Sequence, residues 1–227
     1  MKQMLKKKAW LVCLTLLAIT ASSWVIADGK APQPGLIHMD WKIDMTHGTP
    51  QPIAVTLPGE ETPSLFWYMT YTVTNNTKND IMFAPVISLY TSTGKTVRSG
   101  EGVGPEVFAK IKTLLNNPLL QNNANIAGKL LQGKDHAKDG VVIFRNFDPK
   151  ATGFSIFFSG LSGETATVKL PRKIKVKEID DRGNVVVVEK DTVLLTRSLR
   201  LNYRLNIEAS GRADAKLKFV GKKWVMR

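Results

Sequence analysis

Three histidines, the side chains best suited to binding a transition metal or moving a proton near neutral pH, are scattered through the chain. They are His38, His47 and His136, and neither His-x-His nor His-Glu-x-x-His spacing occurs. The densest group of ligand-type side chains is Asp135, His136 and Asp139, in a polar stretch bounded by glycines. That composition is typical of a solvated loop, and a metal or acid–base site there is the alternative. We expect no metal site and no cofactor.

Two short motifs resemble catalytic or nucleotide-binding patterns but fail at a defining position. Gly94-Lys95-Thr96 matches the end of a P-loop, which requires a glycine where Leu89 stands. Ser162 lies in Gly-Leu-Ser-Gly-Glu, which lacks the last glycine of a nucleophile elbow. Paired carboxylates for glycoside cleavage need only converge in a cleft, and no pair is indicated. We therefore expect no catalytic residues and no enzyme, with a periplasmic hydrolase built from scattered carboxylates as the alternative.

The basic side chains are concentrated at one end of the chain. Its 227 residues include 32 Lys and Arg against 19 Asp and Glu. Residues 28–168 hold 12 of each sign, whereas residues 169–227 hold 16 basic and 7 acidic side chains. Strand alternation predicts one face with Lys173, Lys175 and Lys177, and the outward face of another strand with Arg200 and Arg204. If these strands are neighbours, the five residues form a positive stripe.

Such a stripe would attract an acidic envelope polysaccharide, an anionic lipid surface or an acidic protein partner. The alternative is that the basic residues only keep exposed sheet faces soluble and sheet edges unpaired. Nucleic acid is not an expected partner, because the basic residues are not interleaved with aromatic residues that could stack on bases.

The first 27 residues have the three parts of an export signal: a lysine-rich start, an apolar run over 9–21, and small residues up to Ala27. We expect cleavage after Ala27 and a secreted or periplasmic protein. An uncleaved anchor is the alternative, since residues 9–27 nearly suffice to span a bilayer. The single cysteine, Cys13, lies in the signal, so residues 28–227 have no thiol chemistry and no disulfide. They also contain no other long apolar run, and we expect no further transmembrane segment.

Alternating apolar residues predict many short strands after a linker over residues 28–35. A turn over 75–80 is expected to join two strands as a hairpin, a turn over 180–184 to join two more, and a pair of strands to close around Val220–Lys223. The predicted strands are 36–45, 65–74, 81–91, 141–144, 153–159, 174–179, 185–189 and 199–207.

One helix is predicted, over residues 105–115. Pro105 suits the first helical position, Glu106 suits the positive N-terminus, and Asn116-Asn117-Pro118 ends the helix. Residues 119–133 fit either a second short helix or a loop. We expect a mainly β fold, an antiparallel sandwich forming a single domain over 36–227 with a helical insertion over 105–132. A boundary near Pro171 that splits the chain into two small β domains is the alternative.

The run from Trp67 to Thr77, followed by Ile81, Phe83, Pro85 and Leu89, resembles the strand–Asn-Asn-Thr–strand hairpin of secreted bacterial immunoglobulin-like domains. Gly133, Gly140–Phe144 and Phe154–Gly160 are similar to the part of those domains where a glycine-rich turn leads into the next strands. The resemblance covers residues 65–160, and the chain lacks a cysteine pair and adds the helix. It implies an immunoglobulin-like sandwich with a binding or structural role.

The sequence thus favours an exported, non-catalytic module of the cell envelope. Its basic C-terminal face would contact an acidic polymer, lipid surface or protein. A purely structural role, in which exposed edge strands add to a neighbour's sheet, is a further possibility.

Overall fold

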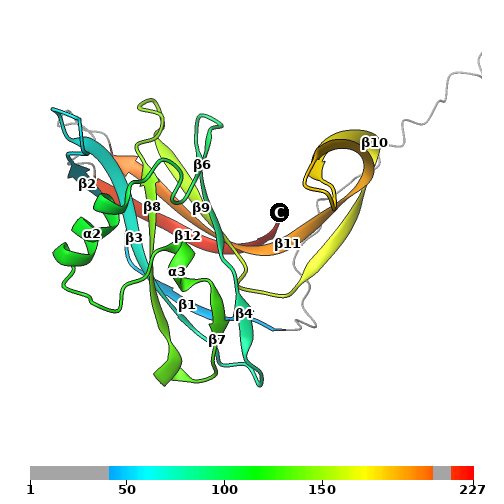
Figure 1. Ribbon diagram of the computed structural model, residues 1–227, viewed down its shortest axis with the longest axis horizontal. Coiled ribbons are helices and arrows are strands. Elements are labelled where there is room, and N and C mark those ends of the chain that lie inside the picture. Colours follow the sequence, from blue (N-terminus) through cyan, green and yellow to red (C-terminus); the bar gives the residue numbers. More distant parts are fainter. Residues whose placement is uncertain (1–40, 207–215) are drawn as a thin grey trace, which may run out of the picture. The chain divides into compact units, whose positions relative to one another are not determined.

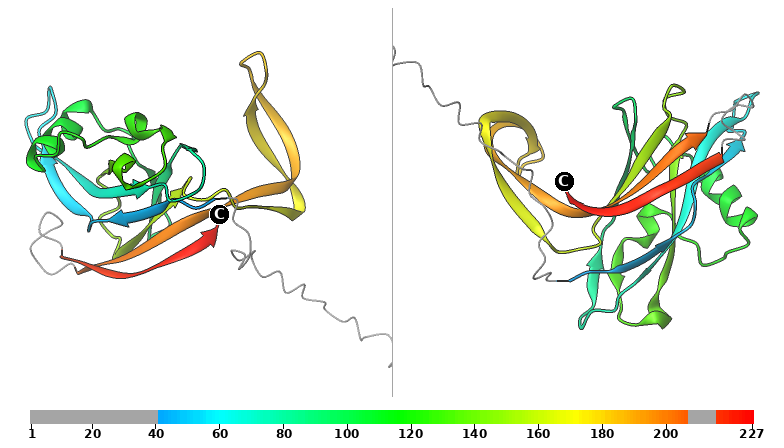
Figure 2. Two further views of the ribbon diagram at one scale, coloured as in Figure 1. Left: turned by 90° about the horizontal axis from the view of Figure 1, so that it is seen from below. Right: turned by 180° about the vertical axis from the view of Figure 1, so that it is seen from behind.

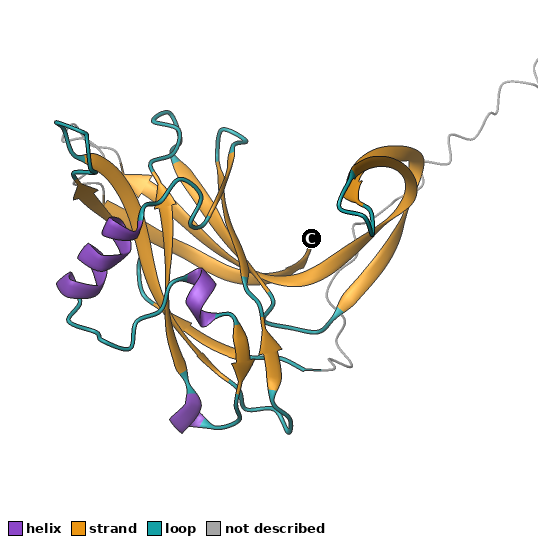
Figure 3. Cartoon of the chain, viewed as in Figure 1, coloured by secondary structure: helices purple, strands orange, loops and turns teal. Residues whose placement is uncertain are grey.

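The structure is a computed structural model that describes residues 41–206 and 216–227. The predicted export signal, the linker and the start of the strand predicted over 36–45 lie outside the described residues, as does His38. Within them strands predominate over helices (Figure 3), and the paired strands are antiparallel. The chain is therefore mainly β, as its alternating sequence predicts.

The first sheet is organised around one long strand, β3. Strand β8 pairs along one edge of β3, while β1 and β2 share the other edge, one beside each half. Gly48, whose backbone donates to the Thr70 carbonyl, lies in the break between β1 and β2. The strands are β1 (Asp44–His47), β2 (Gln51–Val55), β3 (Ser64–Thr74) and β8 (Lys138–Arg145).

The second sheet is built on β11, the longest strand (Figure 1). Its second half lies between β9 and β12, and its first half pairs only with β10, forming a two-stranded ribbon (Figure 2). Beyond β9 come β5 and β6. The strands are β5 (Val86–Thr91), β6 (Thr96–Arg98), β9 (Gly153–Ser159), β10 (Thr165–Ile179), β11 (Val185–Asn206) and β12 (Lys216–Met226).

Side chains from both sheets pack into one hydrophobic core. Alternation along each strand directs every second residue inward, and aromatic rings from the two sheets meet edge to face, as Tyr71 and Phe158 do at 5.3 Å between centroids. The core includes Trp67, Met69, Tyr71 and Val73 of β3, Phe154, Ile156 and Phe158 of β9, and Leu199, Leu201, Tyr203 and Leu205 of β11.

The predicted helix forms α2 (Pro105–Leu114) and covers the other face of the first sheet. Val107 and Ile111 are buried in a second cluster with Phe66 and Tyr68 of β3, which explains why β3 is apolar on both faces. Residues 119–133 hold the short helix α3 (Asn123–Ile126) and strand β7 (Gly128–Leu130). A single 3₁₀ turn, η1 (Lys134–His136), precedes β8. None of the helices described is long and apolar enough to cross a membrane.

The hairpin predicted between residues 65–74 and 81–91 is wrong. The second segment forms two strands, β4 (Ile81–Phe83), which pairs with β7, and β5, which pairs with β9 in the other sheet. Pro85 lies between them and has no amide hydrogen to continue a ladder. The buried Asn75 donates to the carbonyls of Asn79 and Leu130, both at 2.9 Å, and so ties the turn to β7.

The strand pair predicted around Val220–Lys223 is also wrong. Residues 216–226 form one strand, β12, whose register against β11 shifts between Asn202 and Tyr203. Val220 is the extra residue of this bulge, and the φ of Gly221 is 151°, a value that favours glycine. Glycine here allows the strand to continue rather than turn. The hairpin predicted over 174–189 is confirmed, with Asp180–Asn184 at its tip.

Candidate anion-binding face

The five basic residues expected to form one stripe lie in two places. Lys173 is in a bulge of β10, residues 170–173, which also holds Pro171, and Lys175 and Lys177 follow it on the ribbon. Arg200 and Arg204 lie in the second half of β11, where the neighbours are β9 and β12. Strands β10 and β11 do pair, but over other residues, so the register separates the lysines from the arginines.

The lysines of the ribbon lie among acidic and apolar residues. The Nζ atom of Lys173 is 4.0 Å from an oxygen of Glu189, and Lys175 is directly opposite the same glutamate. Lys190 forms an ion pair with Glu178 on the neighbouring strand. Because these pairs are exposed, each contributes little to stability, but together they lower the positive potential of the ribbon.

Arg200 and Arg204 are exposed on the outer face of the second sheet, the face opposite the shared core. Their neighbours along β11, Leu199, Leu201 and Tyr203, are buried, which confirms the alternation predicted for this strand. Both arginines therefore point away from the core and toward solvent.

The register of the sheet places other basic residues beside these two. Arg200 is opposite Lys223 on one side and Phe157 on the other, Phe157 is opposite Ser88, and Ser88 is opposite Arg98. Directly opposite residues of an antiparallel sheet share a face, so these five form a row across it. By the spacing of strands, the row spans about 19 Å. Lys218 is opposite Arg204 in a second row.

Arg227 joins this face through its side chain. Its Nη1 donates to Ser88 Oγ at 2.9 Å, and its guanidinium lies 4.2 Å from the centre of the Phe157 ring. The guanidinium of Arg200 lies 5.8 Å from the same ring. Burial lowers the pKa of Arg227 from its ordinary value, yet an arginine stays charged in proteins. Phe157 thus contacts two cations.

We call these six exposed cations the basic face: Arg98, Arg200, Arg204, Lys218, Lys223 and Arg227. The strands β5, β6, β9 and β12 and residues 197–206 of β11 contain no Asp or Glu. Within residues 41–206 and 216–227, none of the six forms an ion pair. The positive charges of this face therefore add up without a neighbouring acid to cancel them.

Hydrogen bonds hold Arg200 in a defined orientation. Its Nε donates to Asn202 Oδ1 at 2.6 Å and to Ser155 Oγ at 3.2 Å, and Ser155 Oγ in turn donates to Asn202 Oδ1 at 2.8 Å. In the described part of the chain, the two terminal nitrogens of this guanidinium have no hydrogen-bond acceptor. A guanidinium with both terminal nitrogens free can bind a carboxylate, sulfate or phosphate through two parallel hydrogen bonds.

An open groove of about 470 Å³ follows this face along β9 and β11. Two of its lining residues are Arg200 and Arg204, and no lining residue is acidic. The lining also includes neutral residues with hydrogen-bonding groups: Tyr90, Ser92, Ser155 and Asn202. The groove therefore combines positive charge with hydroxyl and amide groups.

The sequence indicates only part of this face. Alternation identifies Arg200 and Arg204, and the excess of basic residues over 169–227 includes Lys218 and Lys223 without placing them on this face. Arg98 belongs to residues 28–168, whose charges balance, and no local signal connects it with β11. Only the order of the strands brings it into the row.

Asp139, Ser162 and the Gly94–Lys95 turn make local structural contacts. Asp139 accepts hydrogen bonds from Thr72 Oγ1 at 2.7 Å and Asn117 Nδ2 at 3.0 Å, so it anchors a loop to β3. Ser162 Oγ accepts from the Glu164 amide at 3.2 Å, and Gly94–Lys95 is the turn between β5 and β6. No group of three His, Cys, Asp or Glu able to hold a metal occurs in the described ranges.

No known protein family, curated protein or solved structure matches this chain.

Proposed function

We propose that this chain is an exported, non-catalytic module of the cell envelope that binds an acidic polysaccharide through the basic face. The observation that carries the proposal is the concentration of six exposed cations on one sheet face, where β5, β6, β9, β12 and residues 197–206 of β11 contain no Asp or Glu. The export signal predicted over residues 1–27 motivates the location. Residues 65–160 resemble immunoglobulin-like domains in sequence, but the hairpin that carries much of this resemblance does not form, so the proposal does not depend on it.

A polysaccharide suits the chemistry of this face better than a lipid bilayer does. A hydroxyl and an amide group, those of Ser88 and Asn202, lie among the cations, and these can bind the hydroxyls of a sugar chain. A row about 19 Å long can contact several repeating units at once. Each contact between exposed charges is weak and screened by salt, but several contacts on one polymer reinforce one another.

The test compares two triple variants with the same change of charge. In the first, Arg98, Arg200 and Arg204 are changed to Gln, and in the second, Lys173, Lys175 and Lys177 are changed to Gln. We expect the first to bind heparin, a sulfated polysaccharide, about tenfold more weakly or worse, which corresponds to about 1.4 kcal/mol. The second should stay close to the parent protein in calorimetry and in salt elution from heparin.

Equal losses in the two variants would show that net charge alone matters and would contradict the proposal. The same proteins are also mixed with vesicles containing phosphatidylglycerol. Binding to these vesicles without binding to heparin would replace the polysaccharide with a lipid surface as the partner.

A further inference from the structure

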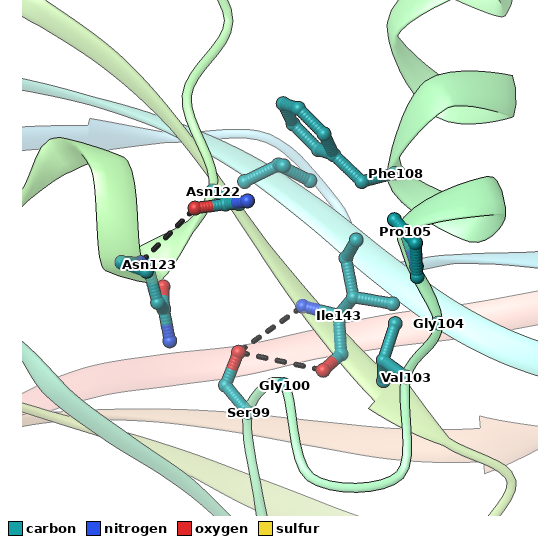
Figure 4. Close-up of a pocket in the computed structure, with 11 residues that line it drawn as sticks. Ser99, Gly100, Val103, Gly104, Pro105, Phe108, Asn122, Asn123 and Ile143 are labelled. Atoms are coloured by element: carbon teal, nitrogen blue, oxygen red, sulfur yellow. Dashed lines mark hydrogen bonds between the residues drawn. The ribbon is translucent and has the colours of Figure 1, made fainter.

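Two hollows in the described part of the chain differ in the charge of their linings. The first has a volume of about 300 Å³ and lies against β8, between the starts of α2 and α3 (Figure 4). Its lining holds no charged side chain, and the hydroxyl of Ser99 is already bonded to the backbone of Ile143. The groove along β9 and β11 instead includes Arg200 and Arg204. An acidic group would lose its hydration in the first hollow without gaining an opposite charge, so of the two only the groove suits it.

The four arginines of the basic face differ in how firmly their side chains are held. Among the residues that the structure describes, the guanidinium groups of Arg98 and Arg204 have no hydrogen-bond partner, so their directions are not fixed. The guanidinium of Arg227 is fixed, but its Nη1 is occupied by the bond to Ser88 Oγ, at 2.9 Å. None of these three arginines offers two free terminal nitrogens in a fixed direction.

Arg200 is the fourth arginine, and it is held through Nε alone. This nitrogen donates to Asn202 Oδ1 at 2.6 Å and to Ser155 Oγ at 3.2 Å, and the guanidinium lies 5.8 Å from the centre of the Phe157 ring. Ser155 is only 7% exposed, whereas Arg200 is exposed, so the hydroxyl supports the guanidinium from within the sheet. Arg200 therefore presents both terminal nitrogens to solvent in a fixed direction.

We infer that Arg200 determines the specificity of the basic face by binding two oxygens of one oxyanion through its two terminal nitrogens. In an acidic polysaccharide this oxyanion is the carboxylate of a uronic acid or the sulfate ester of a sulfated sugar. A planar guanidinium forms two parallel hydrogen bonds with such a group, whereas an ammonium acts as a point charge. Because Ser155 and Asn202 hold the guanidinium in advance, less conformational freedom is lost on binding. This role rests on the proposed function and adds to it that the direction of the contact matters as well as its charge.

The test replaces arginine by lysine, which keeps the charge and removes the pair of parallel donors. Calorimetry at several NaCl concentrations measures binding to polygalacturonate, a polymer of carboxylates, and to dextran sulfate, a polymer of sulfate esters. We expect Arg200→Lys to bind at least one polymer about tenfold more weakly, because one of two hydrogen bonds to a charged group is lost. Arg204→Lys, the same change on the same face of β11, is the matched control and should stay within about twofold of the parent protein. The polymer that shows the loss identifies the oxyanion.

A second comparison tests whether Asn202 positions Arg200. Asn202→Ala removes the acceptor of Arg200 Nε and leaves every charge of the basic face in place. Affinity should fall while the slope of log affinity against log salt stays the same, because that slope follows the number of charged contacts. The fall should be larger in the parent protein than in the Arg200→Lys protein, and the difference is the part of the effect exerted through Arg200. Equal falls in the two proteins would refute the positioning role.

The lysine variants also separate this role from the proposed function. If Arg200→Lys behaves like Arg204→Lys with both polymers, only the charge of Arg200 matters. Recognition by direction is then refuted, while the proposed function stands. If the parent protein binds neither polymer, the proposed function is refuted and the role of Arg200 with it.

Discussion

Tyr71 shows how a single buried hydroxyl affects stability. It is 2% exposed, its ring packs on Phe158, and its hydroxyl has no partner within the described part of the chain. Burial raises the pKa of Tyr71 well above its ordinary value, and it raises the pKa of Tyr203 to about 12. Each raised pKa means that the folded state favours the neutral phenol.

We therefore expect Tyr71→Phe to raise the free energy of unfolding at pH 7 by about 1 kcal/mol, because the ring stays and the unpaired hydroxyl goes. A tyrosine of the unfolded chain ionises near pH 10, so the parent protein loses stability as the pH rises above about 10. The variant should lose less. Urea unfolding at pH 7 and pH 11 measures both effects, with Tyr90→Phe, at an exposed site, as the control. A loss of stability in Tyr71→Phe at pH 7 would contradict this account.

At the scale of single residues, the sequence predicts whether a side chain is buried or exposed when that depends on residues nearby in the chain. The alternation of Arg200 with Leu199 and Leu201 is an example, since one strand decides it. Gly140 is a counter-example, because the sequence around it predicts only the edge of a polar loop. It lies in β8 against Tyr71, and a Cβ there would come within 2.7 Å of Ile126 Cδ1. Glycine is required here because Tyr71 and Ile126, which are distant or non-adjacent in the sequence, leave no room for a side chain.

At the scale of elements, the ribbon formed by β10 and the first half of β11 is weakly stabilised by packing against the rest of the fold. Ile179, Val185 and Val187 near its tip are 74%, 67% and 60% exposed, so little apolar surface is buried there. A two-stranded ribbon without further packing is marginally stable in water. The second half of β11, by contrast, lies between two strands and buries Leu201 completely.

Hydrogen exchange should therefore differ within one strand. We expect the amides of residues 185–195 to exchange at least about tenfold faster than those of residues 199–205, because local opening of the ribbon requires less free energy. Mass spectrometry of peptides from each half of β11 measures this. Equal protection of the two halves would mean that another surface covers the ribbon in solution, which a change with protein concentration would identify as self-association.

A helix or hairpin can be predicted from the sequence when residues close together in the chain specify it. The start of α2 at Pro105 and the hairpin tip at Asp180–Asn184 follow from residues within a few positions. Pairing between distant strands has no such signal: β3 looks like the partner of residues 81–91, yet its partners are β1, β2 and β8. The sequence does not predict a continuous β12, because glycine at position 221 suits a bulge as well as a turn.

At the scale of the whole molecule, the basic face depends on strand order rather than on the distribution of charge along the chain. Arg98 lies in residues 28–168, which hold equal numbers of acidic and basic residues, but β5 and β9 place it in one row with Arg200 and Lys223. If the row is the unit that binds a polyanion, Arg98 and Arg200 contribute comparable contacts. Their distance in sequence is then irrelevant to their contribution.

This leads to a prediction that separates the row from the basic C-terminal region. Arg98→Glu and Arg200→Glu should weaken heparin binding to a similar extent, whereas Lys134→Glu, an equal change at an exposed site on η1, should not. Fewer ions are displaced when a contact is lost, so the plot of log affinity against log salt should become shallower by roughly one unit for each of the first two variants. Calorimetry at several NaCl concentrations gives these slopes. If Arg98→Glu behaves like Lys134→Glu while Arg200→Glu loses affinity, the binding surface is confined to β11 and β12 and the row is not the unit of recognition.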